Sequence, residues 1–105
     1  MTTIVGMLGR LDVPAGADAA LYTCAAGAGA TLNLSMCNRT ASVATVRVAI
    51  TSGGAPAPAD YVEYDTQLPA NGILERTGLV MTAGEKLYVR ADIAGISARA
   101  HGFEK

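Results

Sequence analysis

The sequence predicts an all-β protein, an antiparallel β-sandwich of about eight short strands with a jelly-roll or immunoglobulin-like arrangement. Three observations predict this fold. Apolar and polar residues alternate with a period of two in several segments, and turn signals recur about every eight to twelve residues. No segment has the apolar period of an amphipathic helix. The chain has 105 residues, a length typical of one domain, so residues 1–105 are expected to form a single sandwich.

Clusters of Gly, Pro and Asn divide the chain into these strands. The stretch 52–60 contains two Gly and two Pro and is expected to be an exposed loop without regular structure. Gly27 and Gly29 are expected to lie in a hairpin loop. Asn38 is expected to end a strand and to cap its own turn. The expected strands are residues 2–10, 18–24, 30–38, 42–51, 60–66, 72–80, 85–92 and 95–103.

Alternation assigns one face of each strand to the core. In the segment that begins at Tyr61, the same rule puts Tyr61, Glu63 and Asp65 on one face. The chain has one Phe and no Trp, so its core has little aromatic area, which suits a subunit that completes its packing against neighbours. The expected inward rows are Leu32, Leu34 and Met36; Val46, Val48 and Ile50; Leu87 and Val89; and Ile96, Ala98 and Ala100.

Charge and composition disfavour several classes of protein. The net charge is −1, from eight basic and nine acidic residues, and the absence of a basic stripe disfavours nucleic-acid binding. The uncharged run 19–38 is as long as a membrane span, but its alternation and its Gly, Asn, Ser and Thr residues disfavour that interpretation. The start lacks the features of a signal peptide. A soluble protein made in a cytoplasm is therefore expected, with Cys24 and Cys37 as free thiols.

No motif predicts catalysis. Glu63 and Asp65 are spaced as paired carboxylates or calcium ligands can be, but they lie in a strand-like segment without a cleft signal or a calcium-loop glycine. A solvated or interface-facing strand is favoured for them. His101 is the only histidine, and no nucleophile motif accompanies it. We expect no enzymatic activity, no catalytic residue, no cofactor and no metal site.

Several segments together resemble small structural proteins of tailed-phage virions. The resemblance covers most of the chain from Leu21 onward, but Cys24 and Ala25 stand where the family has Val-Pro. It implies an all-β module without catalytic activity on a head, neck or tail. The segments that carry it are LYT (21–23), the small-residue loop after it, CNRT (37–40), TVRVAI (45–50), YVEYDTQLPANGILERTG (61–78), AGEKLYVRA (83–91) and ISARAHGFE (96–104).

The resemblance implies a virion location and other capsid or tail proteins as partners. A decoration or accessory subunit is the leading hypothesis. A receptor- or glycan-binding module of a tail fibre or baseplate is the alternative. The first strand has no charge before Arg10, so residues 1–11 are expected to contact a second copy or the virion surface. The candidate interface residues are Thr2, Thr3, Ile4, Val5, Met7, Leu8, Tyr61, Glu63 and Asp65.

Overall fold

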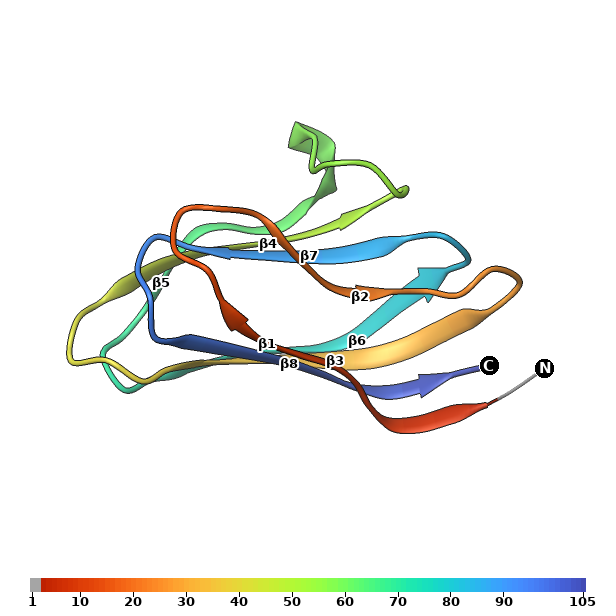
Figure 1. The fold of residues 1–105 in the computed structure, drawn as a ribbon, viewed down its shortest axis with the longest axis horizontal. Coiled ribbons are helices and arrows are strands. Elements are labelled where there is room, and N and C mark those ends of the chain that lie inside the picture. Colours follow the sequence, from red (N-terminus) through yellow and green to blue (C-terminus); the bar gives the residue numbers. More distant parts are fainter. Residues whose placement is uncertain (1–2) are drawn as a thin grey trace.

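The computed structural model describes residues 3–105 as eight β-strands and one short 3₁₀-helix, η1 (Figure 1). The prediction of eight strands is confirmed. The largest difference in a strand boundary is that the first strand runs on to Val13, because its pairing with the last strand extends that far. The elements are β1 (Ile4–Val13), β2 (Ala19–Thr23), β3 (Gly29–Asn38), β4 (Ala44–Thr51), η1 (Pro58–Asp60), β5 (Tyr61–Leu68), β6 (Ile73–Thr82), β7 (Lys86–Ala91) and β8 (Ile96–Glu104).

The strands form two four-stranded antiparallel sheets, with the orders β1-β8-β3-β6 and β2-β7-β4-β5. The first strand pairs with the last, the second with the seventh, the third with the sixth and the fourth with the fifth. The chain is thus one long hairpin folded over on itself, and β8–β3 and β7–β4 pairing completes the sheets. This is jelly-roll connectivity, one of the two arrangements that the sequence leaves open.

The core lies between the two sheets and is made by the inward rows that alternation predicts. All their members are buried except Ile50, which packs against the core but is only partly buried. Ile50 lies opposite Leu87 and so faces inward. The next residue back, Ala49, is buried on the outer face, opposite Tyr61 and Tyr88 on the two neighbouring strands. Alternation therefore gives the direction of each side chain here, but not its degree of burial.

The prediction of a hairpin around Gly27 and Gly29 is wrong. The strands on either side, β2 and β3, belong to different sheets, so the turn connects the two layers. Cys24 instead lies beside the turn between β6 and β7: its amide donates to the Glu85 carbonyl at 2.9 Å, and its carbonyl accepts from Gly84. Cys24 is buried and Cys37 is half-buried, and both are free thiols.

The loop between β4 and β5 projects from the body of the sandwich (Figure 1). Most of its residues are exposed, as its composition predicts. The expectation that it has no regular structure is wrong at its end, where Pro58–Asp60 form η1. Proline fits the first turn of a helix because it lacks the amide hydrogen that would have no partner there. The Asp60 carboxylate accepts from the Ala57 amide at 2.8 Å and closes the turn.

Asn38 ends β3 and caps its turn, as predicted, and it also joins that turn to a second one. Its Oδ1 accepts from the amide and the hydroxyl of Thr40. Its Nδ2 donates to the carbonyls of Ser42, Leu68 and Pro69, so the β3–β4 turn is tied to the end of β5. The side chain is 1% exposed, and these bonds satisfy its polar atoms, as a buried amide requires.

A buried carboxylate holds the C-terminal strand to the other sheet. The Tyr22 hydroxyl donates to Glu104 Oε1 at 2.5 Å, and the Ala25 amide donates to the same oxygen at 3.0 Å. These two donors favour the ionised carboxylate and lower the pKa of Glu104, while burial raises the pKa of Tyr22. Within its own sheet, backbone hydrogen bonds between Gly29 and Lys105 extend the pairing of β8 with β3 to the end of the chain.

Val48→Asp should unfold most of the protein. Val48 is 1% exposed between the sheets, and an unpaired charge buried there costs more than about 4 kcal/mol. Loss of the β-sheet circular dichroism signal would report the effect. Val80→Asp is the matched control, because Val80 is 73% exposed and the change should be within about 0.5 kcal/mol. A folded Val48→Asp protein would contradict this assignment of the core.

The contribution of Glu104 to stability should depend on pH. Its folded-state pKa is lowered below the ordinary value of 4.5, so the stabilisation is present above that pH and is lost as the pH falls through the folded-state pKa. Urea unfolding of wild type and Glu104→Gln should therefore differ most at neutral pH and converge in acid. Glu75→Gln, at an exposed glutamate of β6, is the control. If the difference in stability between wild type and Glu104→Gln were the same at every pH, the ionised Glu104 carboxylate would not be its source.

Candidate interaction surfaces

The first strand is an edge strand with exposed apolar side chains. β1 pairs with β8 on one side, and its other edge is not paired within residues 3–105. Three of the predicted interface residues, Ile4, Val5 and Met7, are exposed, and Val5 is 79% exposed. Thr3 is also exposed, and Thr2 lies outside the described residues. Soluble proteins usually protect such an edge with charge, proline or a bulge.

Leu8, another of the predicted interface residues, differs from its neighbours on β1 in its burial. A β-bulge between Met7 and Gly9 places an extra residue in β1 relative to β8. Leu8 is half-buried and packs against the core. The next residue, Gly9, approaches the backbone of β2 so closely that a Cβ there would lie 2.2 Å from the Leu21 carbonyl oxygen. At this point β1, still the edge strand of its sheet, packs closely against β2 of the other sheet.

The exposed face of β1 continues across the whole sheet. Val5 lies opposite Phe103, Phe103 opposite Thr31, and Thr31 opposite Val80. We call these four exposed residues the apolar row; Thr31 and Val80 each lie between two buried residues, so the row faces away from the core. Phe103 is 46% exposed and Val80 is 73% exposed. Sequence reasoning missed both, because only the strand order reveals that they line up with Val5.

The prediction that Tyr61, Glu63 and Asp65 share one face is wrong for Glu63. Two irregularities in the β4–β5 register add residues to β5, and Asp65 has a positive φ of 52°. A bulge of this kind reverses the face of the residues that follow it. Tyr61 and Asp65 remain on the outer face, as their contacts show. Glu63 lies opposite the buried Val48 and turns inward.

Glu63 closes one long edge of the sandwich. Its Oε2 accepts from Arg76 of β6 at 2.6 Å, and its Oε1 accepts from Thr66 at 2.7 Å. β5 and β6 are the edge strands of different sheets, so the ion pair bridges the two layers. The Glu63 side chain is 16% exposed. This carboxylate therefore has a structural role within the sandwich.

The outer face beside β5 carries an aromatic groove, lined by Pro56, Pro58, Tyr61 and Tyr64, with a volume of about 600 Å³. The two tyrosine rings meet edge to face with centroids 4.9 Å apart. The Arg47 guanidinium carbon lies 4.2 Å from the centre of the Tyr64 ring, and its Nε donates to Asp65 at 2.6 Å. This hydrogen bond lowers the pKa of Asp65.

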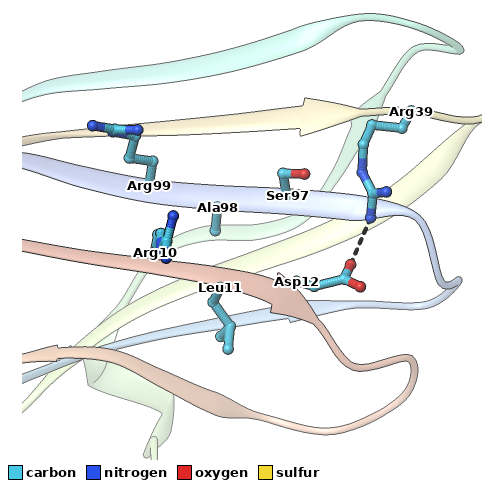
Figure 2. Close-up of a pocket in the computed structure, with 7 residues that line it drawn as sticks. All are labelled: Arg10, Leu11, Asp12, Arg39, Ser97, Ala98 and Arg99. Atoms are coloured by element: carbon cyan, nitrogen blue, oxygen red, sulfur yellow. Dashed lines mark hydrogen bonds and ion pairs between the residues drawn. The ribbon is translucent and has the colours of Figure 1, made fainter. Parts of the chain in front are cut away.

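The outer face of the other sheet is hollowed beside β1. We call this hollow, of about 520 Å³, the arginine groove; its lining includes Arg10, Arg39, Arg99, Asp12 and Ser97. Figure 2 shows Arg10 and Arg99 near each other and the Arg39–Asp12 ion pair further along, with Ser97 between them. The ion pair is 2.6 Å long and exposed. The charges of these side chains sum to a positive value, so the groove favours anions.

Searches of protein families, curated proteins and solved structures found no match to this chain. Among residues 3–105, no group of three or more His, Cys, Asp or Glu side chains is arranged to hold a metal ion. No helix in the same range is long and apolar enough to cross a membrane. His101 is half-buried on the outer face, between Met7 and Asn33 on the adjacent strands.

The bridge between Glu63 and Arg76 should contribute to stability. A double-mutant cycle with Glu63→Gln and Arg76→Gln should give a coupling of about 1 kcal/mol in urea unfolding, because the pair is only partly exposed. The Arg39–Asp12 pair is the control, since both of its side chains are at least half exposed and should couple more weakly. Equal coupling of the two pairs would contradict the structural role given to Glu63.

Proposed function

We propose that this protein is a non-enzymatic structural subunit of a tailed-phage virion, a decoration or accessory protein on the capsid or tail. The observation that carries the proposal is the open edge of β1 and its continuation into the apolar row. Together they offer both unpaired backbone groups and exposed apolar side chains on one side of the molecule. A partner that covers them gains hydrophobic burial and main-chain hydrogen bonds at once.

The resemblance of the segments from Leu21 onward to virion proteins supports the virion as the location. Jelly rolls occur in viral capsid proteins and in lectins, although a fold alone does not assign a function. The partners are other capsid or tail proteins together with further copies of this chain. Repetition on a symmetric lattice allows each single contact to be weak.

The aromatic groove supports a second function, glycan or receptor binding. Tyr61 and Tyr64 present ring surface to the groove beside the polar Arg47–Asp65 pair. Ligand sites commonly combine apolar walls with a few oriented polar groups. A glycan array with wild type and a Tyr61→Ala/Tyr64→Ala variant separates the two functions. If the groove binds glycans, the wild type should bind particular glycans on the array and the variant should not. A purely structural subunit should bind none of them.

Val5→Lys/Val80→Lys should reduce self-association and binding to purified particles without unfolding the protein. Both side chains are exposed in the apolar row, so the folded monomer loses little, whereas an interface would bury two unpaired charges. We expect at least about a tenfold loss of affinity, which corresponds to about 1.4 kcal/mol. Sedimentation velocity and co-sedimentation with particles measure the two effects.

Val43→Lys is the matched control, because Val43 is an equally simple apolar side chain, 55% exposed, in the turn before β4 rather than in the apolar row. It should associate and bind as the wild type does. If wild type is monomeric and does not bind particles, or if both variants behave alike, the proposed interface is wrong. Circular dichroism confirms that each variant is folded.

A further inference from the structure

The arginine groove contains a pair of like charges, Arg10 and Arg99. Arg10 on β1 and Arg99 on β8 are directly opposite in the register, and both are exposed. Like charges directly opposite on neighbouring strands destabilise a sheet. Neither guanidinium has a carboxylate within 4.0 Å among residues 3–105, because the four ion pairs there involve other arginines. The two charges therefore repel each other without local compensation.

The second sheet has a matching pair that is compensated. Arg47 and Arg90 are directly opposite on β4 and β7. Arg47 bonds Asp65 at 2.6 Å, and Arg90 has Asp18 at 3.9 Å. The chain's own carboxylates thus neutralise the arginine pair on one outer face. The arginine pair on the other outer face stays positively charged. An external anion would supply at Arg10 and Arg99 what Asp65 and Asp18 supply at Arg47 and Arg90.

We propose that the arginine groove is a binding site for an oxyanion, held between the guanidinium groups of Arg10 and Arg99. A guanidinium is planar and donates two parallel hydrogen bonds to a carboxylate or a phosphate. Ser97 lines the same groove and can donate a further hydrogen bond. The Arg39–Asp12 ion pair closes the far end and is already neutralised (Figure 2).

The shared chemistry of the ligand is a charged oxygen group, which a carboxylate or a phosphate can both provide. Two NMR titrations of the isotope-labelled protein distinguish these sources. Sodium phosphate replaces chloride in one and sodium acetate replaces it in the other, at constant ionic strength. The Nε–H signals of Arg10 and Arg99 and the Ser97 amide should shift saturably with at least one of them. Saturation with phosphate alone indicates a phosphate-type ligand, and saturation with acetate indicates a carboxylate. Shifts that grow linearly with both would overturn the proposal.

Arg10→Gln tests the same site. Because the Arg10 side chain is exposed, the variant should fold as the wild type does. In chloride it should not lower the melting temperature, since it removes a repulsion. The anion that saturates the wild type should bind about tenfold more weakly to the variant, which has lost a charge-assisted pair. Arg47→Gln is the matched control and should retain wild-type anion affinity. Equal loss in both variants would indicate a general charge effect and would refute the site.

Discussion

The pairing of β8 with both β1 and β3 is the constraint on which the rest of this structure depends. It brings the end of the chain between its first and third strands and places Glu104 against Tyr22 and Ala25 in the core. It also aligns Val5 with Phe103 and Arg10 with Arg99, so the apolar row and the arginine groove exist only because β8 lies there. Antiparallel pairing of such distant segments must overcome the entropy of closing a long loop, which the buried inner faces offset.

The two long edges of the sandwich are closed by different means. At the β5–β6 edge, a hydrogen-bonded ion pair between Glu63 and Arg76 joins the layers. At the β1–β2 edge, the absence of a side chain at Gly9 allows the two backbones to approach closely. The close approach at Gly9 is confined to one point of β1. The part of β1 before Leu8 lies outside this contact, and its outer edge is unpaired within the described residues. An ion pair thus ties the two layers together at the β5–β6 edge, whereas close backbone packing at Gly9 does so at the β1–β2 edge.

The two outer faces also differ in how their charges are balanced. On the β4–β7 face, each arginine has an acidic neighbour, and Arg47 additionally packs over Tyr64. On the β1–β8 face, the charges of Arg10 and Arg99 are not balanced locally, and the apolar row lies further along the same sheet. An apolar area beside a positive one on a single face is an arrangement that a partner with apolar and acidic groups can complement. The proposed oxyanion site and the proposed assembly surface are therefore neighbours, although each rests on its own observations.

The sequence by itself determined the fold class, the eight strands and most of the core, because alternation and turn residues are local properties of the chain. It also identified the turn cap of Asn38 and the exposed start of β1. Only the tertiary structure decided which strands pair, and hence the jelly-roll order, the apolar row and the Arg10–Arg99 pair. The bulges that turn Leu8 and Glu63 toward the interior leave no local signal, since an extra residue is defined only relative to a partner strand. The faces of strands with regular pairing could thus be read from the sequence, and those beyond a bulge could not.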